Sequence, residues 1–374
     1  MTKLHQLADL GQAIWLDYIR RSIIESGELQ KLVDQGMRGV TSNPSIFENA
    51  IAGSTDYDED LNVLVSEGKS VEQIYETLAI DDIRGAADIL RPLYNKTSGN
   101  DGYVSIEVNP TLAYDTEATI AEARRLFGTV RRPNVMIKVP ATPAGIPAIT
   151  ELIGEGVNVN VTLIFSLDQY EAVTSAYIAG LEKLASSAGE VSKVASVASF
   201  FISRVDSVVD TALEGVGNTN LQGKIGIDNA KVAYARFREI FQGARWQRLA
   251  TLGARVQRPL WASTGTKNPA YPDTLYLDGL IGPDTVNTVP PNTLKAFLDH
   301  GNIAQTIDHD VETARERLAK LAELGIDLDS ITKKLQDEGV AAFAKSFNGL
   351  LKSIAEKRQQ LLGDWKELST SVGS

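Results

Sequence analysis

The sequence of 374 residues contains no cysteine and only three histidines. The absence of cysteine excludes disulfide bonds, thiolate metal sites and cysteine nucleophiles. Because His5, His300 and His309 are the only imidazoles, a histidine-rich metal site and a Ser-His-Asp triad are both disfavoured. The chemistry of this protein is therefore expected to depend on carboxylates, amides and amines.

The sequence also lacks an excess of basic residues and a long apolar run. Lys and Arg total 37 against 48 Asp and Glu, so the formal net charge is −11. This balance argues against nucleic acid as a partner, and it requires any phosphate to be bound by a local pocket. No run of about 18 apolar residues is present to span a membrane. The first ten residues lack the apolar core of a secretory signal, so we expect a cytoplasmic protein.

The chain instead contains a regular alternation of short apolar runs and amphipathic segments. Its hydrophobic content of 43% and charged content of 23% are ordinary for a globular protein. Apolar runs typical of buried strands lie at 13–17, 36–44, 103–110, 134–142, 157–165, 193–199, 258–263 and 284–290. Helical patterns lie at 26–35, where Ser26 is a candidate N-cap, and at 57–94, 115–128, 146–153, 168–185, 201–213 and 228–244.

This order of elements predicts one fold. Alternating strands and helices imply a parallel sheet, and eight repeats predict an α/β protein with a single (β/α)8 TIM-type barrel at about residues 10–300. No linker-like run divides the chain, so we expect one domain over residues 1–374. Residues 309–366 have a helical pattern and no strand, and we expect them to form additional C-terminal helices packed on the barrel.

Polar residues stand at or near the carboxyl ends of the predicted strands, where barrel enzymes carry their catalytic groups. They are Asp17, Asn43, Glu107, Lys138, Asn160, Thr162 and Ser199. One Asn or Ser alone could be a polar cap of the barrel interior. The convergence of an Asp, a Glu and a Lys favours chemistry instead.

Lys138 is the most informative of these residues. It lies in the apolar run Asn134–Thr142 and shares one strand face with Met136. Burial lowers the pKa of an amine and favours its neutral form, which can attack a ketone and form a Schiff base. The alternative is a lysine at a strand tip with its ammonium group in solvent.

Six stretches of the sequence resemble the transaldolase family, and together they cover roughly residues 13–300. They are Trp15–Asp17, Gly39–Phe47, Val104–Val108, Met136–Thr142, Asn158–Ser166 and Ala198–Asp206. The combination of T-S-N-P, I-K-V-P-A-T and N-V-T-L-I-F-S is specific for this family. The resemblance implies an aldolase-type barrel that acts on sugar phosphates without a metal or other cofactor.

The resemblance also implies roles for individual residues. Lys138 matches the Schiff-base lysine, Asp17 the aspartate that handles the proton of the bond-breaking hydroxyl, and Glu107 the glutamate that works through a water. The remaining matches are Thr162 beside that water, Asn43 and Asn160 for substrate hydroxyls, Ser199 and Phe201 after the sixth strand, and Arg204 for the phosphate. The alternative for Arg204 is a surface ion pair with Asp206 or Asp210.

The sequence departs from the family pattern after the seventh strand. Many members have Ser-Phe-Arg there, and the arginine holds the phosphate. Here Ser263 matches the serine, but Gly265 stands at the arginine position. We expect Lys267 to supply the second cation, and the alternative is a solvated loop lysine. This loop indicates a longer branch of the family.

The implied activity is that of a transaldolase, a transferase of the non-oxidative pentose phosphate pathway. It moves a dihydroxyacetone unit from sedoheptulose 7-phosphate to glyceraldehyde 3-phosphate, which gives erythrose 4-phosphate and fructose 6-phosphate. The partners would be sugar-phosphate substrates, and the protein a monomer or homodimer. The alternatives are a class I aldolase that releases free dihydroxyacetone and a non-catalytic sugar-phosphate-binding barrel.

Overall fold

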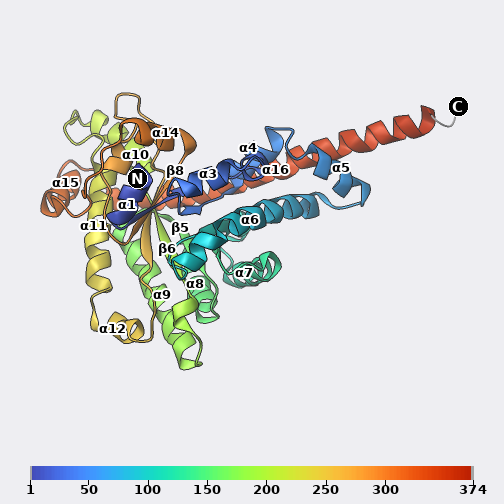
Figure 1. The fold of residues 1–374 in the computed structure, drawn as a ribbon. Helices are drawn as coiled ribbons and strands as arrows, with labels where there is room; N and C mark the ends of the chain where they lie inside the picture. The colour runs from blue at the N-terminus through green and yellow to red at the C-terminus, as the bar shows by residue number, and fades with distance from the viewer. Residues whose placement is uncertain (1, 372–374) are drawn as a thin grey trace.

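The computed structural model describes residues 2–371, and its centre is a closed barrel of eight parallel strands in sequential order (Figure 1). The strands are β1 (Gln12–Leu16), β2 (Gly39–Val40), β3 (Tyr103–Glu107), β4 (Val135–Pro140), β5 (Val159–Ile164), β6 (Ser196–Phe201), β7 (Arg258–Ala262) and β8 (Thr285–Val289). Pairing of β1 with β8, from Gln12 opposite Thr285 to Leu16 opposite Val289, closes the barrel. The predicted (β/α)8 fold is confirmed, while the single-domain organisation stays a prediction.

Helices surround the barrel and also lie across one end of it (Figure 1). They are α1 (Lys3–Asp9), α2 (Arg21–Glu25), α3 (Glu28–Asp34), α4 (Pro44–Ala52), α5 (Asp58–Ser66), α6 (Val71–Lys96), α7 (Thr116–Val130), α8 (Gly145–Gly154), α9 (Leu167–Ser186), α10 (Ser203–Gly215), α11 (Ile225–Ile240), α12 (Ala244–Ala250), α13 (Leu275–Asp278), α14 (Pro291–His300), α15 (Val311–Glu323) and α16 (Leu328–Ser371), with short 3₁₀ turns η1 (Pro110–Leu112) and η2 (Val191–Lys193). None of the helices in the described part of the chain is long and apolar enough to cross a membrane.

Several predicted boundaries differ from the observed ones. Ser26 is the C-cap of α2 and not an N-cap. The N-cap of α3 is the next residue, Gly27, which adopts a left-handed conformation (φ 77°) that glycine allows. The predicted helix 57–94 is divided into α5 and α6, since Ser70 forms a capping box with Gln73. The sixth strand begins at Ser196 and not at 193, because the η2 turn precedes it.

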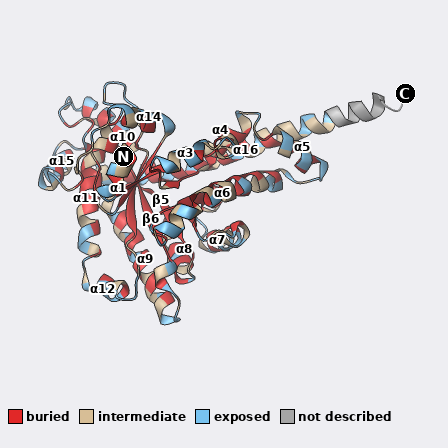
Figure 2. Cartoon of the chain, viewed as in Figure 1, coloured by how far each residue is buried: buried red, intermediate tan, exposed pale blue. Residues whose placement is uncertain are grey.

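The barrel interior and the layer between barrel and helices form two apolar cores. Alternate residues of each strand point inward, as Trp15, Tyr103 and Met136 do. The rings of Trp15 and Tyr103 lie 6.4 Å apart. Gly39 lines up with Trp15 in the neighbouring strand, and a Cβ there would lie 2.5 Å from the indole, so only glycine fits. Figure 2 shows that the buried residues concentrate on the strands and on the inner helix faces.

The longest helix, α16, crosses the carboxyl ends of the strands and then continues beside α4 (Figure 1). The side-chain amide of Gln336 donates to the carbonyl oxygens of Ala141 (2.9 Å) and Leu163 (3.0 Å) at the ends of β4 and β5. Further along, Lys357 Nζ donates to the carbonyl oxygens of Ile51 (3.2 Å) and Ser54 (3.1 Å). The predicted C-terminal helices are confirmed, but their position over the barrel mouth was not foreseen.

Candidate active site

Lys138 and Glu107 lie side by side on adjacent strands, in register with each other. Lys138 is only 5% exposed, and its Nζ lies 3.3 Å from Glu107 Oε2 and donates to the Ser42 carbonyl oxygen at 3.3 Å. The apolar, β-branched residues of β4 make the strand, and its inward face carries Lys138 into the barrel. The alternative of a solvent-exposed lysine is therefore wrong.

Asp17 directly follows β1, and both its backbone N–H and its carboxylate form hydrogen bonds. Its N–H donates to the Val289 carbonyl oxygen (2.8 Å), and Thr41 Oγ1 donates to its Oδ1 (2.8 Å). Thr41 Oγ1 also lies 2.6 Å from Thr288 Oγ1. Burial raises the pKa of the Asp17 carboxyl above its ordinary value, while Lys138, the Thr41 hydrogen bond and Arg204 partly oppose this shift.

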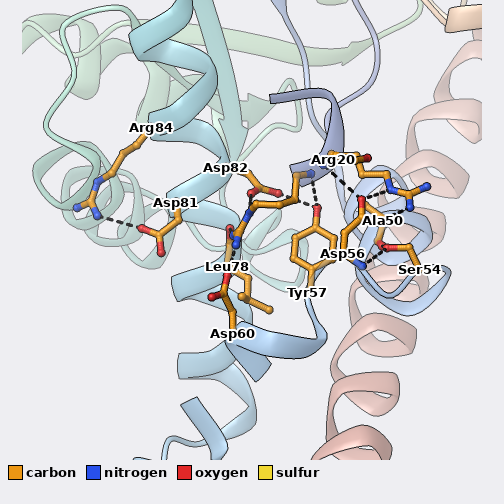
Figure 3. A network of polar contacts seen from close by, with 12 residues as sticks. Arg20, Ala50, Ser54, Asp56, Tyr57, Asp60, Leu78, Asp81, Asp82 and Arg84 are labelled. Carbon is orange, nitrogen blue, oxygen red and sulfur yellow. Dashed lines mark hydrogen bonds and ion pairs between the residues drawn. The ribbon is translucent and has the colours of Figure 1, made fainter. Parts of the chain in front are cut away.

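A network of charged residues fixes the segment that follows Asp17 (Figure 3). Arg20 makes a bidentate pair with Asp56, at 2.5 and 2.7 Å. Arg21 Nε donates to Asp82 (2.6 Å), a fully buried carboxylate that also accepts from the Tyr57 hydroxyl at 2.7 Å. These bonds tie the start of α2 to the segment before α5 and to α6. No motif in the sequence indicated this network.

The environment of Glu107 suits proton transfer. Burial raises the pKa of its carboxyl, and the positive charge of Lys138 partly opposes the increase. Thr162 lies on β5, two residues beyond Asn160, which is in register with Lys138. Its Oγ1 is buried and hydrogen-bonds to no group among the described residues, so it is available to substrate or to a bound water.

Of the two asparagines predicted to bind substrate hydroxyls, Asn43 lines the cavity and Asn160 does not. Asn160 lies beneath the cavity, where its amide donates to Ser105 Oγ (3.0 Å) and its Oδ1 accepts from Ser199 Oγ at 2.7 Å. Asn43 caps α4, because its Oδ1 accepts from the Ile46 N–H at 2.9 Å. The Nδ2 group of Asn43 is the part left for a ligand.

Arg204 starts α10 and lies among aromatic rings. Its Cζ is 5.1 Å from the ring centre of Phe201 and 5.9 Å from that of Phe343. Burial lowers the pKa of the guanidinium from its ordinary value. No ion pair joins Arg204 to Asp206 or to Asp210 in the described structure, so the alternative of a surface pair is not observed.

The loop after β7 brings a second cation toward Arg204. Burial and the positive charge of Arg204 both lower the pKa of Lys267. The side chain of Lys267 is exposed, however, and does not line the cavity that Arg204 lines, so its role at the phosphate stays a prediction. Ser263 lies at the base of the loop with φ 55°, and its Oγ is 2.9 Å from Ser203 Oγ.

These side chains surround one cavity of about 90 Å³ at the carboxyl end of the barrel. It is lined by Asp17, Thr41, Asn43, Lys138, Thr162, Ser199, Phe201, Arg204, Ala262, Ser263, Thr288 and Phe343. Most of the predicted site residues therefore converge, with Glu107 beside Lys138 and Asn160 below, whereas Lys267 is exposed on the loop after β7 and outside the cavity lining. Sequence reasoning missed Thr41 and Thr288, although both lie at strand ends, and Phe343, for which no local motif exists.

A buried lysine with two carboxylates at the mouth of a (β/α)8 barrel is the arrangement expected of barrel enzymes that use an amine as nucleophile. The sequence model of the transaldolase/fructose-6-phosphate aldolase family matches residues 14–354. The chain belongs to this family, which confirms the resemblance and makes the protein a transaldolase-type transferase.

Several relatives cover almost the whole chain. A transaldolase of Trichodesmium erythraeum is 47% identical over 372 residues, which are 96% of this chain and 98% of that protein. Transaldolase 1 of Streptomyces avermitilis is 51% identical over 357 residues, 94% of each chain. A transaldolase of Thermobifida fusca is 49% identical and covers 95% of this chain and 98% of its own.

Proposed function

We propose that the protein transfers a dihydroxyacetone unit between sugar phosphates through a Schiff base on Lys138, with sedoheptulose 7-phosphate and glyceraldehyde 3-phosphate as substrates. The observation that carries this proposal is a lysine that is 5% exposed, 3.3 Å from one carboxylate and in one cavity with a second. The reaction would belong to the non-oxidative pentose phosphate pathway. Cytoplasmic location and a monomeric or homodimeric state stay predictions.

Imine formation needs a neutral amine and a proton shuttle. Lys138 attacks the ketone carbon, and the carbinolamine loses water to give a protonated imine. Glu107, which lies 3.3 Å from Lys138 Nζ and whose pKa is raised by burial, is the candidate shuttle. The free hydroxyl of Thr162 supports a role in positioning the water involved.

Cleavage of the C3–C4 bond requires a base at the C4 hydroxyl. Asp17 accepts that proton, the aldehyde leaves, and the electron pair of the broken bond moves into the imine to form an enamine. Asn43 would hold a hydroxyl of the three-carbon fragment directly, while Asn160 would act from below through Ser199. Attack of the enamine on the second aldehyde, followed by imine hydrolysis, completes the transfer.

The phosphate of either substrate would lie between α10 and the loop after β7. Arg204 supplies a forked guanidinium at the first turn of α10, and Lys267 adds a point charge. Ser263 and backbone N–H groups around Gly265 add neutral donors. Such a local cluster of cations is what a protein of net charge −11 needs to bind a dianion.

The decisive experiment combines turnover with covalent trapping. The enzyme should convert fructose 6-phosphate and erythrose 4-phosphate to sedoheptulose 7-phosphate and glyceraldehyde 3-phosphate, with and without excess EDTA. Borohydride added with fructose 6-phosphate should inactivate it and attach a three-carbon unit to Lys138, and a Lys138→Met variant should not be labelled. Loss of activity in EDTA that a divalent ion restores would contradict the proposal. Turnover without an aldose phosphate would favour the aldolase alternative.

A further inference from the structure

We infer that Phe343 of α16 closes the cavity over Lys138 and determines whether the bound three-carbon intermediate is transferred or hydrolysed. This inference rests on the proposed lysine mechanism. Lys138 Nζ lies 5.5 Å from the centre of the Phe343 ring, and Phe343 lines the same cavity. Phe343 is only 4% exposed and Lys138 only 5%. The ring therefore covers the amine on the side of α16.

The position of the ring is fixed by contacts of α16 with the strand ends. Leu163 has a left-handed backbone (φ 61°) where the register of β5 and β6 shifts, and its carbonyl oxygen is paired by Gln336 of α16. Gly339 permits the close approach of the helix, because a Cβ there would lie 2.8 Å from Leu163 Cδ2. Ser346 Oγ accepts from Ser45 Oγ at 2.8 Å. These contacts lie on both sides of Phe343 and place its side chain in the barrel mouth.

The chemistry of the intermediate explains why such a ring matters. After cleavage the fragment remains on Lys138 as an enamine. For transfer, its nucleophilic carbon forms a bond to the aldehyde carbon, and the aldehyde oxygen takes up a proton. For release, the same carbon takes up a proton, water adds to the resulting iminium carbon, and the C–N bond breaks to give dihydroxyacetone and the free amine. Water is therefore the competing reactant, and an apolar cover over Lys138 limits its access.

The Phe343 ring also affects the charge of the imine that forms on Lys138. An aromatic face within about 6 Å of a cation stabilises it, particularly where water is excluded. Both Lys138 Nζ and Arg204 Cζ lie within this range of the Phe343 ring, at 5.5 and 5.9 Å. The protonated imine keeps the positive charge at the same nitrogen. Phe343 thus contacts both the reacting end of the cavity and its phosphate-binding end.

A neighbouring aromatic residue provides a matched control. Phe347 lies one helical turn further along α16 and is 8% exposed, but its ring contacts Tyr75 at 5.3 Å. It lines a neighbouring cavity of about 430 Å³, whose lining includes Glu107 and Asn43 but neither Lys138 nor Phe343. Substitution of Phe347 therefore perturbs the same helix and the Glu107 side of the site, while the Phe343 ring stays next to the amine.

The test measures dihydroxyacetone released per erythrose 4-phosphate consumed, with fructose 6-phosphate as donor. Phe343→Ala should raise this ratio about tenfold, the effect of a modest change in relative barrier heights. Phe343→Leu, which keeps an apolar side chain of lower volume, should raise it by a smaller factor and covers the case in which the alanine variant fails to fold. Phe347→Ala and Phe347→Leu should leave the ratio unchanged, and thermal unfolding of all four variants compares their stability.

An unchanged ratio in a folded Phe343 variant would overturn the inference, and so would an equal increase in the Phe347 variants. Borohydride trapping of the wild-type enzyme separates this result from the proposed function. Absence of a trapped adduct would refute the Schiff base. A trapped adduct together with an unchanged ratio would refute only the role of Phe343.

Discussion

At the scale of single residues, the two carboxylates of the site have different neighbours. Asp17 accepts from Thr41, whereas Glu107 pairs with Lys138. Burial is the main cause of the raised pKa of both groups. Two carboxyls in different hydrogen-bond environments can take different steps of one reaction. The separation of roles can be tested by removing one base while keeping its shape.

Asp17→Asn should form the imine but cleave the C3–C4 bond slowly, because an amide cannot accept the hydroxyl proton. A positioned general base contributes about 10²–10⁴-fold, so kcat should fall by a factor in this range. Slow turnover with retained borohydride trapping is the expected result. Near-normal turnover would show that another group is the base, with Glu107 the first candidate.

The phosphate site gives a second prediction at this scale. Arg204→Ala should raise KM for fructose 6-phosphate about ten- to a hundredfold, as expected for the loss of hydrogen bonds to a charged group. Lys267→Ala should raise it by a smaller factor, because a lysine lacks the planar fork. Neither variant should change KM for unphosphorylated fructose. If Lys267→Ala leaves KM for the phosphorylated donor unchanged while Arg204→Ala raises it, Lys267 is a solvated loop residue.

At the scale of elements, α10 is joined to α11 by a buried carboxyl group. Asp206 is 1% exposed, and its Oδ1 accepts from the Gly226 N–H at 2.6 Å. Burial raises its pKa to about 7; Gly226 and Tyr276 oppose this shift, whereas Asp210 and Asp228 add to it. Asp206 and Arg204, the proposed phosphate ligand, therefore lie on the same helix.

Stability should depend on pH through Asp206. The folded-state pKa of about 7 lies above that of an unfolded Asp, so the stabilisation is fully present below pH about 4 and is lost as pH rises through about 7. Asp206→Asn keeps the Oδ1 acceptor and removes the titration. The stability of the wild type relative to this variant should fall by at most about 1.4 kcal/mol per pH unit in that window. Urea unfolding at pH 5 and pH 8 measures it, and a pH-independent difference would contradict the assignment.

Elements with a strong local pattern were predictable, and those that depend on distant contacts were not. The alternation in β3, β4 and β5 is visible in the sequence because one face of each strand is apolar. β2 pairs over only Gly39 and Val40, although its apolar pattern is longer. The helix α4 was missed, although Asn43 and Pro44 form a standard start signal.

At the scale of the whole molecule, the strand ends of the site were predictable and its cover was not. Lys138 and Glu107 lie toward the carboxyl ends of apolar runs, and barrel topology brings strand ends together whatever their separation in the chain. Phe343 lies on a helix whose pattern indicates only an apolar face. The direction in which α16 crosses the barrel depends on contacts such as Gln336 with Leu163, which no local pattern encodes.

The position of α16 also bears on how the protein becomes active during synthesis. Domains generally fold from the N-terminus as the ribosome makes them. The barrel can close once β8 has emerged, since β1 pairs with it. At that moment Lys138, Glu107 and Asp17 are already in place, but Phe343 is still to be translated. A nascent chain would therefore assemble its reactive amine before the ring that shields it, and full control over the intermediate would come only with the last helix.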